Sequence, residues 1–375
     1  MLAQKQLNQI VIANPCGRQP ALSADTGSLY CGRRWGRRGF TLIELLVVIS
    51  IIAILIGILL PALAKYRLQG YVTSATEEMN SVKTACLMYY SNYNAYPGPF
   101  SEADIANQSI KTSGGEVVTG TQNMLIGLMG TMYTTSPTSL PSGTAAVSVS
   151  GSTGVNAVNP VYVTNPLGSG PIDYSNGNVQ QKSYLSPDNT LLLTSPPNGA
   201  ASSTLPTLYD TFPDGLPILY YRKIPGLPGT TGVPVQLNAS ASPPGAFYLN
   251  SNYYYITNPS LIASSGAAYN EQQQVINGTS YTTALNNNTT YTGALAYEVT
   301  NPNGYPAQSP TATITNTSVP NAVGTPVLGG FVLISAGPDR IYGPPLAVDA
   351  SQGSVGTLTW ASAATSDDII VGGGQ

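Results

Sequence analysis

The sequence predicts an α+β protein in which one long, bent N-terminal helix packs on an antiparallel, β-rich C-terminal head with long loops. Two observations predict this fold. An uninterrupted apolar stretch near the N-terminus is followed directly by an amphipathic one. The second half of the chain carries short apolar runs between residues that favour turns, mainly Gly, Pro, Asn and Ser. We expect three parts: a basic leader over residues 1–39, the helix over 40–95 and the head over 96–375.

The apolar stretch has the length of a membrane span. From residue 45 to residue 60 it has no charge, and Ser50 is its only polar side chain. With its partly apolar flanks it reaches the ~20 residues that a helix needs to cross a bilayer. Four basic residues lie just before it: Arg33, Arg34, Arg37 and Arg38. By the positive-inside rule the N-terminus therefore stays cytoplasmic, and everything after Leu60 is exported.

One carboxylate, Glu44, lies at the start of this apolar helix. An ionisable residue within a membrane helix costs roughly 2.5 to 3.5 kcal/mol on insertion scales, so it usually has a partner and a function. No lysine or arginine within the helix can be that partner. Glu44 is therefore a candidate functional residue.

The residues GFTLIE, from Gly39 to Glu44, closely resemble the processing motif of type IV pilins and of the pseudopilins of type II secretion. The resemblance implies that a prepilin peptidase in the membrane cuts after Gly39 and methylates the new N-terminus at Phe40. It implies that the Phe40 amine of one subunit neutralises Glu44 of its neighbour in a filament. Pro61 falls where many members of the family place a helix-bending proline.

Two other interpretations of this stretch stay open, besides that of a plain membrane anchor. The residues RRGFTL also look like a twin-arginine export signal, and residues 61–64 offer an A-x-A-like site for ordinary signal peptidase. Either would release a soluble protein that starts near Lys65. However, a carboxylate in the apolar core is unhelpful to a disposable signal, and the run exceeds the usual 7 to 15 residues of a signal peptide. These features favour the pilin-like interpretation.

The composition argues against several function classes. Only 8% of residues are charged, and the chain after the leader is acidic. No nucleic-acid partner is expected, because nucleic-acid binders present a basic face. Histidine is absent, which removes the commonest general base and zinc ligand. There is also no activated nucleophile pattern, phosphate-binding loop or Cys-x-x-Cys pair, so the sequence predicts no enzyme.

After Pro61 the sequence becomes amphipathic and predicts a second half of the same helix, lying on a core. Turn-forming residues end it within residues 92–99, and Tyr96-Pro97 is similar to the end of the N-terminal helix in G-type pseudopilins. About three heptads are too few to favour a coiled-coil seam over packing on a sheet. The apolar positions recur every three or four residues, at Val72, Ala75, Met79, Val82, Cys86, Tyr89 and Tyr93.

Further elements are expected in the head. Residues 121–130 predict a helix with one apolar face, formed by Met124, Leu125, Leu128 and Met129. Strands are expected within residues 214–223, 253–256 and 331–334. Residues 131–210 consist of short apolar runs broken by turn formers, and we interpret this long insertion as surface decoration.

The C-terminal segment carries a candidate metal site. A strand that begins at Gly330 runs into a Gly-Pro-Asp turn, and Ser366-Asp-Asp-Ile-Ile370 follows. G-type pseudopilins close their sheet with similar elements, whose loop binds calcium. The resemblance implies oxygen ligands for Ca²⁺ from Asp339, Asp367, Asp368 and the Ser335 hydroxyl. The chain departs by about twenty inserted residues and by lacking a tryptophan after Ile370, and a Pro-Asp pair is also an ordinary type I turn.

Taken together, the sequence predicts a type IV pilin-like subunit, most similar to a G-type pseudopilin of type II secretion. Its expected partners are a prepilin peptidase, other pseudopilins in a helical filament and an inner-membrane assembly platform. The head is expected in the periplasm and then in a periplasmic or cell-surface filament. One alternative is a type IV pilus subunit used in adhesion or DNA uptake. Another is a secreted binding protein with a cleaved signal peptide.

Overall fold

The structure is a computed structural model, and the chain divides into two compact units, Met1–Leu59 and Leu60–Gln375. It describes residues 40–130, 132–133, 145–151, 161–165, 183–186, 191–193, 204–213, 215–224, 233–236, 240, 245–252, 295–299, 329–338, 342, 348–349, 354–355 and 366–373.

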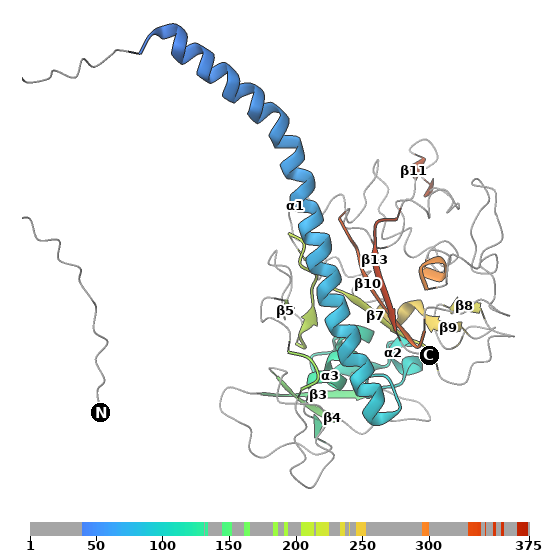
Figure 1. The fold of residues 1–375 in the computed structure, drawn as a ribbon. Coiled ribbons are helices and arrows are strands. Elements are labelled where there is room, and N and C mark those ends of the chain that lie inside the picture. Colours follow the sequence, from blue (N-terminus) through green and yellow to red (C-terminus); the bar gives the residue numbers. More distant parts are fainter. Residues whose placement is uncertain are drawn as a thin grey trace, which may run out of the picture. The chain divides into compact units, whose positions relative to one another are not determined.

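The long helix is confirmed. Helix α1, Leu42–Tyr93, runs without a break through 52 residues and includes Pro61 (Figure 1). Within its apolar half, the Ser50 hydroxyl donates to the Leu46 carbonyl at 2.8 Å. This bond satisfies the lone polar side chain inside the helix itself, as a lipid environment requires. The helix ends where the turn formers begin, and a bend at Pro61 stays a prediction.

The apolar stripe of the second half of α1 packs against the head, as predicted. Ala75, Met79, Val82, Cys86 and Tyr89 are all buried, whereas Leu87 and Met88 on other faces of the helix are exposed. Met79, Val82, Cys86 and Tyr89 join one hydrophobic core with residues from α3 and from several strands of the head. The stripe is therefore the seam between the helix and the head.

A buried helix, α3, Gly120–Met129, lies at the centre of that core. The prediction of a helix here is correct, and its four predicted apolar residues are buried; the structure adds that the other six residues of the helix are buried too. Its polar side chains have partners in the head: Thr121 Oγ1 donates to Ile218 O at 2.7 Å, Gln122 Nε2 to Leu205 O at 3.1 Å, and Asn123 Nδ2 to Phe100 O at 3.0 Å. Because these polar side chains have hydrogen-bond partners, the polar face of the helix can be buried as well as the apolar one.

A four-stranded antiparallel sheet in the order β1-β3-β4-β2 contradicts the surface interpretation of residues 131–210. Its strands are β1, Ile110–Thr112; β2, Met132–Tyr133; β3, Ala145–Gly151; and β4, Val161–Asn165. Val147, Val149 and Val163 belong to the hydrophobic core, as do Leu185 and Leu205 from later in the same region. The apolar runs were short because each one contributes only a few inward-facing residues to the core.

A second antiparallel sheet in the order β13-β10-β7 contains two of the predicted strands. These are β7, Leu219–Arg222, and β10, Phe331–Ser335, and they pair with β13, Ile369–Gly373. All five residues of β10 are buried, as expected of a central strand. In this register Leu333 lies between Tyr220 and Val371.

The remaining described elements are small. The predicted strand within 253–256 lies outside the described residues. The head is also not wholly antiparallel, because β8, Val233–Gln236, pairs in parallel with β9, Gly245–Tyr248. The others are α2, Glu102–Ala106; β5, Leu192–Leu193; β6, Thr207–Leu208; the 3-10 helix η1, Leu249–Asn252; β11, Val348–Asp349; β12, Ser354–Val355; and a helical turn at residues 295–299.

A buried ion pair fixes the loop that follows α1. Arg222 Nε lies 3.2 Å from Oε1 of Glu102, and the guanidinium also donates to the carbonyls of Tyr96 at 3.0 Å, Gly98 at 2.7 Å and Phe100 at 2.6 Å. Burial raises the pKa of Glu102, and the Arg222 charge opposes that rise. One guanidinium on β7 therefore holds three carbonyls of this loop in place.

Candidate functional site

The start of α1 is closed by its own side chains. Thr41 N donates to Oε2 of Glu44 at 2.8 Å, Thr41 Oγ1 donates to the same oxygen at 2.8 Å, and Glu44 N donates back to Thr41 Oγ1 at 3.3 Å. This reciprocal pattern is a capping box, in which Thr or Ser and a Glu three residues later satisfy the free N–H groups of a helix start. Glu44 therefore has a structural role within its own chain.

Sequence reasoning gave Glu44 only an intermolecular partner and missed this cap. The signal was present, because Thr41 and Glu44 have the S/T-x-x-E spacing directly before an apolar run. The cap uses Oε2; among the residues that the structure describes, Oε1 of Glu44 has no hydrogen-bond partner. The cap and an intermolecular contact are thus compatible.

The first half of α1 exposes nearly all of its apolar surface. Phe40 and Leu42 are each 81% exposed and Ile43 is 69% exposed. The most apolar 18-residue window of the helix is 0% buried, and by length and composition α1 could cross a membrane. A helix that is apolar all round needs lipid or other helices to cover it. Within the part of the chain that the structure describes, nothing covers this half of α1.

The other predicted processing and assembly residues are placed only in part. Phe40 precedes the helix and is exposed, and Pro61 lies within α1. Gly39 lies outside the described residues. Glu44 is the only charged side chain between residues 40 and 64. The geometry therefore supports a start of α1 that is accessible, apolar and singly charged.

At the other end of the chain, the structure brings together the two segments that the calcium prediction needs. Because β10 and β13 pair antiparallel, the turn after Ser335 lies beside residues 366–368. Gly337 has φ +62°, and a Cβ there would clash with the Asp367 carbonyl oxygen. This close approach explains the glycine, since only glycine combines that backbone conformation with so little room. Asp339 itself lies outside the described residues.

The neighbour of Asp368 is a residue that sequence reasoning missed. Glu298, in the helical turn 295–299, is 6% exposed and its side chain is hydrogen bonded to Asp368. Burial raises the pKa of Glu298 to about 7, and the hydrogen bond with Asp368 opposes the rise. No local pattern around Glu298 marks it, because its partner lies about 70 residues further along the chain.

Two buried oxygen atoms in this region are of the kind that a hard cation takes as ligands. Oε1 of Glu298 and Oγ of Ser366 are buried and have no hydrogen-bond partner among the described residues. Carboxylate and hydroxyl oxygens are ligands that Ca²⁺ takes. Asp367 is exposed, so its carboxylate also faces solvent. The described part of the chain contains no group of three or more acidic, His or Cys side chains placed to hold a metal ion. Carbonyls or Asp339 would have to complete such a site.

Comparisons with known proteins point to the same end of the chain as the capping box. Residues 36–60 match the prokaryotic N-terminal methylation motif. The chain is 38% identical over 73 residues to a fimbrial protein of Neisseria meningitidis serogroup B, covering 20% of this chain and 43% of that protein. It is 35% identical over 96 residues to the type IV major pilin protein PilE of Neisseria gonorrhoeae, covering 23% and 57%. No solved structure matches the chain.

The chain spans about half the length of these relatives, and the similarity covers about a fifth of its own length. A methylation motif that opens a long apolar helix, followed by a β-rich head, defines a class of proteins. The chain is a type IV pilin-like protein. The more specific prediction of a G-type pseudopilin is not confirmed, because the relatives are named as pilins and fimbrial proteins.

Proposed function

We propose that this chain is a structural subunit of a pilin-like filament. A prepilin peptidase cuts after Gly39 and methylates Phe40. The apolar half of α1 then holds the subunit in the bacterial inner membrane, with the N-terminus cytoplasmic and the head periplasmic, until an assembly platform extracts it. In the filament, the helices of neighbouring subunits cover one another and the heads lie outside.

The observation that carries this proposal is the uncovered first half of α1. The most apolar 18-residue window of the helix is 0% buried. The helix nevertheless begins with a capped first turn that contains a single carboxylate. A disposable signal peptide needs no such carboxylate, whereas a helix that packs among copies of itself gains a charge that can pair with a neighbour's amine. The matching methylation motif ends at residue 60, within the same helix.

Two variants separate the cap of Glu44 from its charge. Glu44→Gln keeps the capping box, in which Gln can replace Glu, and removes the charge. Thr41→Ala removes the cap, at a cost of about 1 kcal/mol, and keeps the charge. We expect Glu44→Gln to be cleaved almost normally but to form no filaments, and Thr41→Ala to retain them. Normal filaments from Glu44→Gln would show that the proposed charge pairing is wrong.

Mass spectrometry of the mature N-terminus tests processing. We expect N-methylated Phe40 as the first residue. A chain that starts near Lys65 would instead support the remaining alternative, a secreted binding protein released from a signal peptide.

As to the kind of filament, we propose a pseudopilus that drives protein export by type II secretion. The C-terminal elements support this assignment, because a turn after β10 lies beside the segment that leads into β13. The second candidate is a type IV pilus subunit for adhesion or DNA uptake, which the names of the relatives favour. Deletion of the gene distinguishes them: lost surface fibres with intact enzyme secretion would contradict the secretion assignment.

We also propose that Ca²⁺ binds beside β13. Asp339, Asp367 and Asp368 would supply its carboxylate ligands, as the sequence predicts. Support comes from the hydroxyl oxygen of Ser366, which is buried beside them in sequence and has no partner among the described residues. When bound, the ion would join the turn after β10 to the segment before β13.

A further inference from the structure

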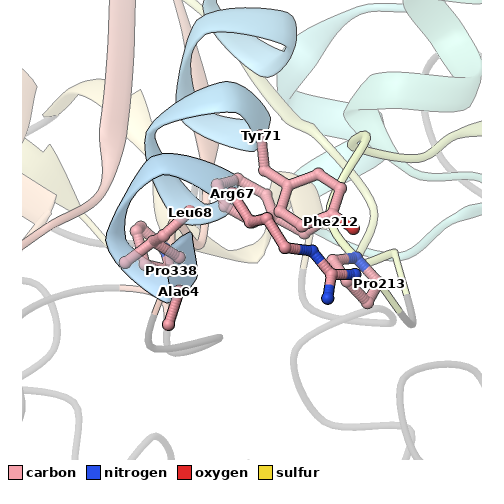
Figure 2. A pocket seen from close by; sticks show the side chains of 7 residues that line it. All are labelled: Ala64, Arg67, Leu68, Tyr71, Phe212, Pro213 and Pro338. Atoms are coloured by element: carbon pink, nitrogen blue, oxygen red, sulfur yellow. The ribbon is translucent and has the colours of Figure 1, made fainter. Parts of the chain in front are cut away.

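A pocket of about 380 Å³ opens between α1 and two loops of the head, all within the second unit (Figure 2). Its volume lies in the range of sites that bind small molecules or side chains. The lining is apolar or aromatic apart from one guanidinium. The main lining residues are Arg67, Leu68 and Tyr71 from the helix, and Phe212, Pro213 and Pro338 from the loops.

The loop on one side of the pocket is attached to the helix. Thr211 Oγ1 donates to the Tyr71 carbonyl at 3.4 Å. The rings of Tyr71 and Phe212 pack at a tilt, with their centroids 6.1 Å apart. The pocket is therefore already formed in the single chain and needs no rearrangement of this loop to accept a partner.

The pocket is the uncovered continuation of the apolar stripe of α1. Tyr71 and Leu68 lie one and two turns before Ala75 on the same helix face. The head buries Ala75 completely, whereas Leu68 is 45% exposed. The cover that the head supplies thus stops at Tyr71, although the stripe continues toward the N-terminus.

A partner for this pocket must bring apolar side chains and one anion. The start of α1 has both properties. Phe40, Leu42 and Ile43 are highly exposed, and Glu44 is the only charged residue between residues 40 and 64. Arg67, the charge on the pocket, forms no salt bridge within the described part of the chain. The two surfaces are complementary in charge and in hydrophobicity.

The start of α1 cannot reach the pocket of its own chain. Residues 44 and 67 lie on one continuous helix. At about 1.5 Å per residue they are about 35 Å apart along it. A contact between them therefore requires two copies of the chain.

We infer that the pocket receives the N-terminal end of α1 from a second copy of this chain. Phe40, Leu42 and Ile43 lie against the apolar lining, and the Glu44 carboxylate pairs with the Arg67 guanidinium. A carboxylate has about four lone-pair sites, so Glu44 can accept from Arg67, from its own cap and from an N-terminal amine. The inference rests on the proposed filament function and specifies which surfaces of two subunits meet.

Site-specific photocrosslinking in the native host tests the contact. A photoreactive phenylalanine replaces Tyr71 in full-length chains that carry two different epitope tags, and sheared filaments are irradiated. We expect crosslinks between the two tags, with the attached peptide from residues 40–46. Filaments that form but crosslink only elsewhere would overturn this inference and leave the filament function standing. A wild-type chain that forms no filaments would overturn both.

A matched pair of charge variants provides a second test. Arg67→Gln removes the pocket charge, and Lys65→Gln removes a neighbouring exposed charge that does not line the pocket. We expect Arg67→Gln to lower filament yield at least about fivefold, as for loss of one partner of an interface ion pair, and Lys65→Gln to leave it within about twofold. Cleavage at Gly39 should be normal in both variants. Equal yields from the two variants would overturn the role of Arg67.

Discussion

The two halves of α1 differ in what covers their apolar side chains. In the first half, most large side chains are about half exposed or more, and Phe40 and Leu42 reach 81%. In the second half, one stripe is buried by the head, and Met79 and Val82 have no exposed surface. One helix thus combines an apolar surface that the described part of the chain leaves exposed with an apolar stripe that the head covers. Substitutions in the first half should act on assembly, and those in the second half on folding.

The largest loss of stability is expected where the head holds the loop after α1. Arg222→Met removes the partner of buried Glu102 and the donor to three carbonyls. Breaking a buried ion pair in this way costs about 3–5 kcal/mol. Thermal unfolding in detergent should show a large fall in Tm. The neighbouring Lys223→Met is the control. An equal fall in Tm in both variants would contradict the role of Arg222 in holding this loop.

The covered half of α1 offers a closely matched comparison. Met79 is fully buried, whereas Met88 on the same helix is 53% exposed. Met79→Ala should destabilise the head by about 2–5 kcal/mol because it leaves a cavity in the core. Met88→Ala should change the free energy of unfolding by no more than about 0.5 kcal/mol. Denaturant unfolding measures both, and similar midpoints would place the seam on the wrong face.

The pH dependence of unfolding tests the Glu298 site in the head. Burial raises the pKa of Glu298 to about 7, above its value of 4.5 in an unfolded chain. The protonated form is therefore favoured by folding, and its stabilisation is present below pH 4.5 and lost as pH rises through about 7. Glu298→Gln should flatten this part of the profile, whereas the exposed Glu77→Gln should not. An unchanged pH dependence of unfolding in Glu298→Gln would contradict the raised pKa of Glu298.

A smaller and conditional effect is expected from calcium. A ligand that binds only the folded state stabilises it by about 2.7 kcal/mol at a hundred times its dissociation constant. We expect Ca²⁺ to raise Tm, because its carboxylate ligands are brought together only in the folded head. Asp368→Asn should abolish the increase, and Mg²⁺ should give less. No change in Tm at pH 8 with millimolar Ca²⁺ would contradict the site.

The sequence predicted the elements with strong periodicity or length. The stripe from Val72 to Tyr93 predicted the second half of α1, and the continuous apolar run predicted the first half. Periodicity could not show that α3 is buried all round, because Thr121, Gln122 and Asn123 are satisfied by partners in distant segments. The pairing between short strands in residues 131–210 could not be predicted from the sequence either, because strand register depends on contacts between distant segments.

The candidate site could likewise be predicted only where its parts are local. The motif from Gly39 to Glu44 is contiguous, so sequence alone pointed to it. The juxtaposition of Glu298 with Asp368 depends on how two separate segments approach the same sheet end. The pocket beside Arg67 arises because Phe212 and Pro338 come from loops far apart in the chain. Neither arrangement leaves a pattern of spacing to recognise.

The capping box at Thr41 has a consequence for the electrostatics of a cleaved subunit. After cleavage following Gly39, the helix cap would be the second residue of the mature chain. The cationic N-terminal amine of Phe40 would then lie close to the positive end of the helix macrodipole, which is equivalent to about half an elementary charge. These two positive charges repel in an apolar medium. Glu44, held in the first turn by Thr41, offsets most of that charge, so a subunit can carry a charged terminus within a membrane or a filament core.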